Sequence, residues 1–157
     1  MAYLTVGNGL EEYLAKLGNL AQKSEDVCGE AAEAGGAVVA DAIRTELDAV
    51  PTDETYSHGE TMRKGPRAIE KVGLQNSFGV APVQNRNGYV NVKVGFDGYN
   101  KLGEPNPMIA RSVVKGTSFM KKNDFVNKGV RKSREKAEET MRVTVDEKIY
   151  AIMENDK

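Results

Sequence analysis

The chain has 157 residues, with 22 Lys and Arg against 23 Asp and Glu, a formal net charge of -1, one cysteine, one histidine and no tryptophan. This length suits one modest domain, so we expect residues 1–157 to form a single domain. Leu, Ile, Val and Phe account for only 34 residues, which predicts a thin core and dependence on neighbouring subunits for burial. No stretch approaches the ~20 apolar residues of a membrane span, and the N-terminus lacks a secretion-signal pattern, so we expect an intracellular protein.

Acidic and basic residues are divided along the chain. Residues 1–61 carry a net charge of -9, residues 62–134 carry +11 and residues 135–157 carry -3. One interpretation is that these are ordinary solvated faces, since exposed charges are the default. The other is that oppositely charged surfaces meet between copies of the chain, because a basic surface attracts acidic protein or phosphate.

Residues 8–50 have the periodicity of a helical part, which we predict to contain two helices. Asn8 can cap the first, a short amphipathic helix, and Ser24 can cap the second. Pro51 is expected to end the second helix. Small residues crowd its first half, where another backbone can approach closely and where the paired glycines predict a bend. These are Ala31, Ala32, Ala34, Gly35, Gly36 and Ala37.

Residues 52–72 are polar and contain few large apolar side chains, which is typical of a long exposed loop or arm. Residues 73–122 read as a strand-rich part with loops. Within it, residues 76–83 and 89–94 have strand character, the second by strict alternation of valines. The intervening Asn87-Gly88 pair favours positive backbone angles and predicts a hairpin turn.

Two further helices are predicted after the hairpin. Residues 108–115 form a short one that Gly116 would stop. Residues 123–154 form a long amphipathic C-terminal helix, capped by Asn123 or Asp124, with Val126, Val130, Ala137, Met141, Val145, Ile149 and Ile152 along its apolar face. The expected class is α+β: two N-terminal helices, a small antiparallel sheet with long loops, and the long C-terminal helix packed on that sheet.

Residues for enzymatic chemistry are sparse. His58 and Cys28 lie 30 positions apart with no catalytic or metal-ligating partner nearby in sequence. We interpret His58 as an exposed loop residue and Cys28 as a small buried packing residue. No phosphate-binding or dinucleotide motif is present. We therefore expect no enzyme activity, no cofactor and no metal site.

Basic side chains supply the one functional signal in the composition. They cluster between residues 115 and 134, with three more in the preceding polar segment, and suit contact with acidic protein or with nucleic-acid phosphates. Aromatic residues for base stacking are few, so base-specific reading is not indicated. The candidate interaction surface comprises Arg63, Lys64, Arg67, Lys115, Lys121, Lys122, Lys128, Arg131, Lys132 and Arg134.

The order of elements and three local signatures support a family resemblance. The signatures are GLQNSFGV from Gly73, MIARSVVKGTS ending in Gly116-Thr117-Ser118, and NDF opening the last helix at Phe125. Together they resemble the tail-completion or head-tail joining proteins of tailed bacteriophages, the gene-product-ten family of HK-ninety-seven-like siphophages. The resemblance extends over most of the chain.

This resemblance implies a non-catalytic virion component of a phage or prophage. It implies a ring-like homo-oligomer in the neck between portal complex and tail tube, with connector, tail terminator or tail tube proteins as partners, and a place in the host cytoplasm during assembly. The alternative from the residues themselves is a small nucleic-acid-binding protein that uses the basic tract 115–134. An enzyme is the weakest interpretation, because no convergent set of titratable groups is visible.

Overall fold

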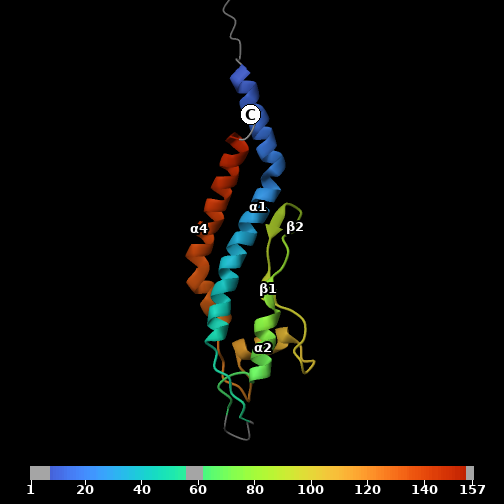
Figure 1. Cartoon of the computed structure of the whole chain (residues 1–157), viewed down its shortest axis with the longest axis vertical. Helices are drawn as coiled ribbons and strands as arrows, with labels where there is room; N and C mark the ends of the chain where they lie inside the picture. Colours follow the sequence, from blue (N-terminus) through green and yellow to red (C-terminus); the bar gives the residue numbers. More distant parts are fainter. Residues whose placement is uncertain (1–7, 56–61, 155–157) are drawn as a thin grey trace, which may run out of the picture.

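Two long antiparallel helices form the axis of the molecule (Figure 1). The structure is a computed structural model that describes residues 8–55 and 62–154. Its helices are α1 (Asn8–Asp48), α2 (Ala68–Ser77), α3 (Asn106–Lys115) and α4 (Phe125–Glu154), and its strands are β1 (Phe78–Val80), β2 (Gln84–Arg86), β3 (Tyr89–Asn91) and β4 (Val94–Phe96). The mixed α+β class is confirmed. None of the described helices has the length and apolarity to cross a membrane.

The prediction of two N-terminal helices is wrong, because α1 is one helix of 41 residues. The Ser24 hydroxyl does not cap a new helix but donates a 2.8 Å hydrogen bond to the Ala21 carbonyl within α1. No proline interrupts the segment, and the helix also runs unbroken through Gly35 and Gly36. Pro51 follows the helix end closely, as predicted. The predicted cap at Asn8 involves a side chain outside the described ones.

The C-terminal helix α4 packs along α1 rather than on the sheet, which corrects that part of the predicted architecture. Its buried residues are Phe125, Gly129, Ser133 and Ala137, spaced four apart. We call the contact line between α1 and α4 the seam. The valines that periodicity predicted for the apolar face of α4 lie beside it, and Val130 is 41% exposed. Small residues take the seam because they let the two helix backbones approach closely.

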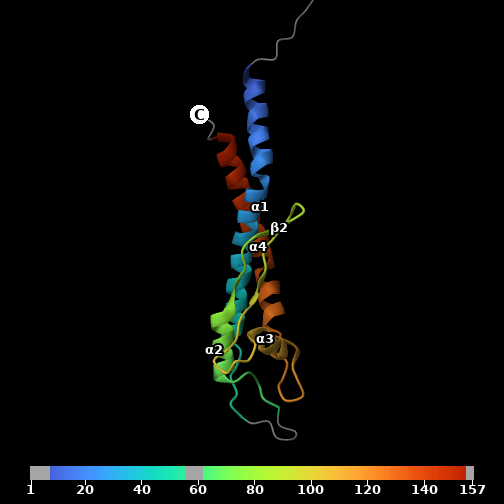
Figure 2. The ribbon, with the colours of Figure 1, turned by 90° about the vertical axis from the view of Figure 1, so that its right-hand side faces the viewer.

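Two short antiparallel ladders run beside α1, and both belong to one long hairpin (Figure 2). β1 pairs with β4, with Phe78 opposite Phe96, and β2 pairs with β3 across the predicted turn. That turn is confirmed, since Asn87 and Gly88 have φ of 54° and 81°. The predicted strands 76–83 and 89–94 are both shorter in the structure. Residues 76–77 belong to α2, β1 ends at Val80 before Pro82, which cannot donate a ladder hydrogen bond, and β3 ends at Asn91, while β2 lies in the predicted link.

The predicted loop 52–72 is shorter than expected, because α2 begins at Ala68 and continues through Ser77. The Glu70 carboxylate accepts the Arg67 backbone N–H at 2.7 Å and so satisfies a free donor at the start of α2. This stabilises a helix that the apolar pattern alone did not indicate. His58 lies outside the described residues.

The core lies where the C-terminal half of α1 and the N-terminal end of α4 meet α2, α3 and the β1–β4 ladder. Phe125, Leu47 and Leu74 have no exposed surface, and the Phe96 ring meets the Phe125 ring edge-on with centroids 6.0 Å apart. The prediction that α3 stops at Gly116 is confirmed, with Gly116 at φ 75°. This core fixes the loops at one end of the molecule.

Candidate interaction surface

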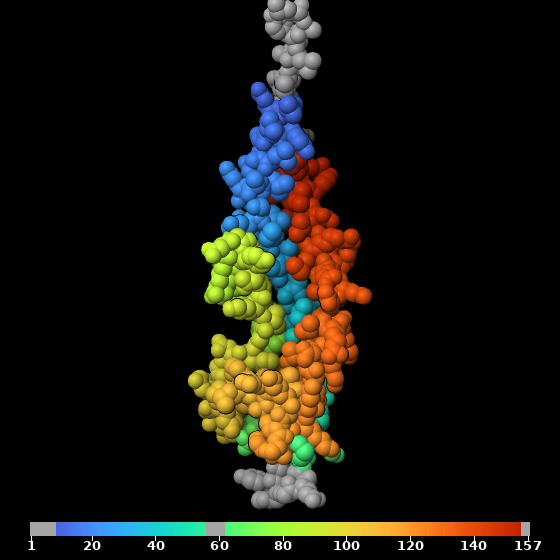
Figure 3. Space-filling model, turned by 180° about the vertical axis from the view of Figure 1, so that it is seen from behind, coloured from blue at the N-terminus to red at the C-terminus, as the bar shows by residue number. Residues whose placement is uncertain are grey.

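Opposite charges occupy the two ends of the elongated molecule. The acidic end, residues 8–40 and 135–154, carries 12 acidic and 5 basic side chains. The basic end, residues 41–55, 62–80 and 94–134, carries 9 acidic and 14 basic side chains. Between them lie residues 81–93, which include the hairpin tip. The division along the sequence has therefore become a division along the axis (Figures 1 and 3).

Two of the predicted surface arginines are engaged inside the chain. Arg67 hydrogen-bonds through both Nε and a terminal nitrogen to Glu70, and its guanidinium also lies 3.3 Å from Glu104. The hydrogen bond to Glu70 raises the pKa of Arg67, and the nearby negative charges of Glu70 and Glu104 act in the same direction. Arg63 is 3.8 Å from Glu70, with only 14% of its side chain exposed. Both arginines hold the base of α2 in place.

Two more predicted residues on α4 pair with nearby carboxylates. The ammonium of Lys132 contacts Glu46 of α1, and Arg134 lies 2.9 Å from Glu138 one turn further along α4. The Lys132 pair joins the two long helices. The Arg134 pair is exposed on both sides and contributes little to stability.

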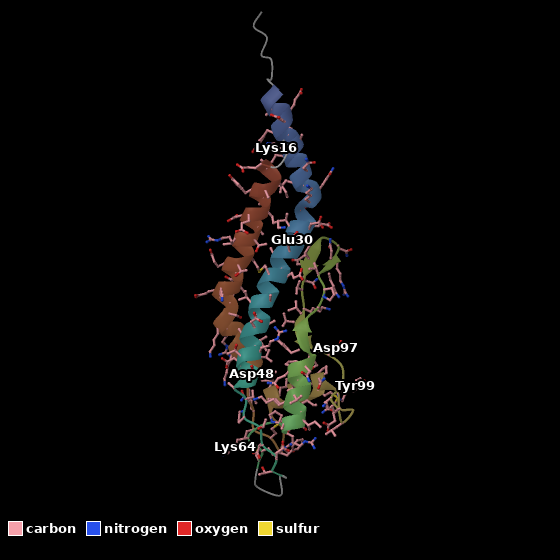
Figure 4. The ribbon with its side chains drawn as sticks, viewed as in Figure 1. Lys16, Glu30, Asp48, Lys64, Asp97 and Tyr99 are labelled. Atoms are coloured by element: carbon pink, nitrogen blue, oxygen red, sulfur yellow. The ribbon has the colours of Figure 1, made fainter. Side chains whose placement is uncertain are left out.

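The other six candidates are exposed and form no ion pair with any residue in the described ranges. We call them the free cations: Lys64, Lys115, Lys121, Lys122, Lys128 and Arg131. They come from the segment before α2, the end of α3, the loop that follows it and the start of α4. Lys64, which Figure 4 labels, lies at the tip of the basic end. Unpaired cations on one end favour a negatively charged partner.

Exposed apolar groups lie among these cations. The backbone of Arg63 pairs with two neighbours of Met120: its N–H donates to the Phe119 carbonyl at 2.9 Å, and its own carbonyl accepts the Lys121 N–H at 2.8 Å. Met62 and Phe119 each directly precede a residue of this bridge, and their side chains are 37% and 45% exposed. The Arg63 guanidinium lies 5.5 Å from the Phe119 ring centroid.

The acidic end also exposes an apolar stripe. The N-terminal part of α1 extends past the end of α4 (Figure 1), and we call residues 9–21 the overhang. Leu10, Tyr13, Leu14 and Leu17 follow helical spacing along it and are 47%, 51%, 57% and 39% exposed. The stripe is visible in the sequence, whereas the sequence does not show that none of the described helices covers it.

The described residues also form a cavity beside α2. This cavity of about 610 Å³ lies between α2 and the loop before α3, lined by Gly73, Asp97, Tyr99 and Asn106 among others (Figure 4). The buried Asn106 Oδ1 has no hydrogen-bond partner there, but it packs 2.7 Å from where a Cβ on Gly73 would stand. No metal-binding group of three or more His, Cys, Asp or Glu occurs in residues 8–55 and 62–154.

Cys28 is exposed, which corrects the prediction that it is a buried packing residue. Its neighbour Val27 takes the buried position on α1, at 6% exposure. The buried positions of α1 recur every four residues here, at Val27, Ala31 and Gly35, which leaves Cys28 at the border of the α1–α4 seam. The thiol there adjoins a shallow apolar hollow that includes Ala31 and Met141.

Comparisons of the chain with protein-family models, with curated proteins and with solved structures find no match. The chain's own surfaces are therefore the features that bear on its function. The most distinctive of these are the six free cations at one end and the uncovered apolar stripe at the other.

Proposed function

We propose that this chain is a structural subunit of a tailed phage or prophage, a head-tail connector or tail-completion protein that assembles in the neck between portal complex and tail tube. The signatures at Gly73, Gly116 and Phe125 support this proposal through the family resemblance. An independent support is that the two ends of the molecule carry opposite net charges and that each end exposes apolar side chains. A subunit whose two ends differ in charge and expose apolar side chains is suited to repeated contact with neighbouring subunits.

One observation carries the proposal: the overhang of α1 exposes a leucine-rich stripe although the rest of α1 packs against α4. Leu10, Leu14 and Leu17 in water cost free energy that a neighbouring subunit would recover, at about 25 cal/mol per Å² of apolar surface buried. Large exposed apolar surface on a small protein marks a contact with another molecule.

The experiment is co-expression with the products of the genes on either side of this one, followed by pull-down on a tag carried by this chain. Portal-complex and tail-tube proteins should be retained in fixed ratios, and negative-stain images of the eluate should show closed particles. A chain that retains neither protein at micromolar concentration would contradict a place in the neck. A non-phage gene neighbourhood would contradict the phage assignment as a whole.

A second candidate function is non-specific binding of nucleic acid at the basic end. The observation that favours it is the set of free cations, because phosphates can bind Lys121, Lys122, Lys128 and Arg131 without breaking an internal ion pair. Fluorescence anisotropy with a labelled duplex over a salt series tests this. Contact with four to five phosphates predicts a slope of roughly -4 in a plot of log affinity against log salt. Absence of binding at low salt contradicts it.

A further inference from the structure

We infer that the overhang of one copy docks onto the basic end of the next, so that Leu10, Tyr13, Leu14 and Leu17 of α1 cover Met62 and Phe119 of a second copy of this chain. The inference deepens the proposed function, and rests on it only in that both require copies of the chain to associate.

The overhang has the form of a ligand helix. Its apolar side chains recur at intervals of three and four residues, which is the pattern by which an amphipathic helix lies in an apolar groove. The charged residues of the overhang are Glu11, which borders the stripe, and Glu12 and Lys16, and the acidic Glu25 and Asp26 follow about one turn beyond it. The docking segment is therefore apolar on one side and sits in an acidic surrounding.

The basic end has the complementary composition. Met62 and Phe119 each directly precede a residue of the Arg63–Met120 bridge, so the fold brings the backbones of these two apolar residues together. Lys64, Lys121 and Lys122 flank these two side chains and form no ion pair in the part of the chain described. An acidic amphipathic helix matches both features of this surface.

Charge favours contact between the unlike ends of two copies over contact between two like ends. Two acidic ends placed tip to tip would bring together two regions with 12 acidic and 5 basic side chains each, and like charges resist that contact. An acidic end against a basic end joins opposite charges. Such an unlike contact repeats from copy to copy, and it closes into a ring where the rotation between copies allows and otherwise forms a filament.

One chain cannot make this contact with itself. About 34 residues of α1 separate Leu14 from the end of the helix, and at 1.5 Å per residue they span roughly 50 Å. Lys64 of the basic end lies beyond Asp48 along the same axis, at the opposite end of the molecule from Lys16 of the overhang (Figures 1 and 4). Any cross-link between the two surfaces therefore joins different copies.

Cross-linking of single-cysteine variants tests the orientation. Cys28→Ser removes the one native thiol, which is exposed. Ala21→Cys then places a thiol beside the stripe, and Ser118→Cys places one beside Phe119, both at exposed positions. The two variants, one carrying a mass tag, are mixed in equal amounts with a short bismaleimide. The mixed product should exceed each homodimer by well over the twofold ratio that random pairing gives. A dominant product of two Ala21→Cys chains, or no product, would overturn the inference.

A pair of adjacent lysine substitutions tests the surface. Leu14→Lys lies on the stripe, whereas Ala15→Lys lies 100° around the helix and introduces the same charge. Both positions are exposed, so neither variant should unfold the chain. We expect Leu14→Lys to weaken self-association at least tenfold, about 1.4 kcal/mol, and Ala15→Lys to leave it within about twofold. Equal effects of the two variants would contradict the inference.

A charge exchange then fixes the partner surface. Lys121→Glu with Lys122→Glu should weaken association, and Glu11→Lys with Glu12→Lys should do the same. Mixing the two double variants should restore a contact between unlike chains. If both double variants self-associate like the native chain, the basic end is not the acceptor.

The two proposals can fail separately. A chain that associates but is indifferent to Leu14→Lys and gives no mixed cross-link refutes the docking and leaves the neck assignment standing. A chain that gives the mixed cross-link but retains no portal or tail-tube protein refutes the neck assignment and leaves the docking standing.

Discussion

Gly129 of α4 lies so close to Ile43 of α1 that a Cβ at position 129 would stand 2.8 Å from the Ile43 Cα. No side chain larger than hydrogen fits between the two helices at this point. The contact brings the helix axes together beside the core, where Leu47 and Phe125 are fully buried. The length of the molecule, and with it the separation of the two charged ends, depends on this seam.

Gly129→Ala should destabilise the chain by about 1 to 3 kcal/mol, because the new methyl group meets helix backbone that cannot move aside. Urea unfolding followed by circular dichroism measures the change. Gly35→Ala should cost less, since its Cβ meets the flexible thioether of Met141 rather than backbone. Gly18→Ala is the matched control. Its Cβ has nothing within 4 Å, so it should stabilise the helix by up to ~1 kcal/mol.

Glu70→Ala should destabilise the chain by about 2 to 4 kcal/mol, because the carboxylate is buried and accepts three hydrogen bonds from Arg67. Its loss would leave Arg63 and Arg67 without their shared partner. Glu138→Ala removes an exposed pair with Arg134 and should change stability by less than ~0.5 kcal/mol. Comparable unfolding midpoints for the two variants would show that Glu70 does not hold α2.

Asp53 should titrate well below an ordinary carboxyl group. Hydrogen bonds from the Thr55 hydroxyl and from the Lys64 and Thr55 backbone N–H groups lower the pKa of Asp53 from 3.8 to about 2. A folded-state pKa below the unfolded one stabilises the fold above the unfolded value, and this stabilisation is lost as the pH falls from near 4 toward 2. Carboxyl NMR titration measures the pKa directly. Asp53→Asn should flatten the pH dependence of stability across that window.

Cys28 should react completely with a thiol reagent in the native state, because its side chain is exposed on α1. One equivalent per chain is expected without denaturant, and the same yield in urea. Reaction only after unfolding would mean that Val27 and Cys28 have exchanged places, which requires a helix register different from the one in this structure.

Local signals in the sequence predicted much of the fold. Asn87-Gly88 specified the hairpin turn, Gly116 the end of α3, and the residues around Phe125 the start of α4. The predictions that failed concern features that depend on contacts between distant parts of the chain. Ser24 has the chemistry of a helix cap but lies within a continuous helix. Gly129 and Ser133 are buried in the seam, although neither is an apolar residue that hydrophobic periodicity would select. Close packing selects small side chains, which hydrophobic periodicity does not register.

The candidate surface was predictable in composition but not in detail. Basic tracts identified the free cations, yet pairing with Glu46, Glu70 and Glu138 removed four of the ten candidates from the unpaired set. Those partners lie on other elements or one turn away. Met62 was missed, because its backbone comes next to that of Phe119 only through the Arg63–Met120 bridge. This bridge connects segments more than 50 residues apart in the sequence. No local pattern encodes such pairing.

The central claim is that the chain assembles through its two unlike ends. Sedimentation velocity of the full chain over a concentration series from low micromolar to several hundred micromolar tests it most directly. The account predicts a sedimentation coefficient that rises with concentration for the native chain and for Ala15→Lys, and a series for Leu14→Lys that is displaced to higher concentration. A single monomeric boundary at every concentration for the native chain would contradict it.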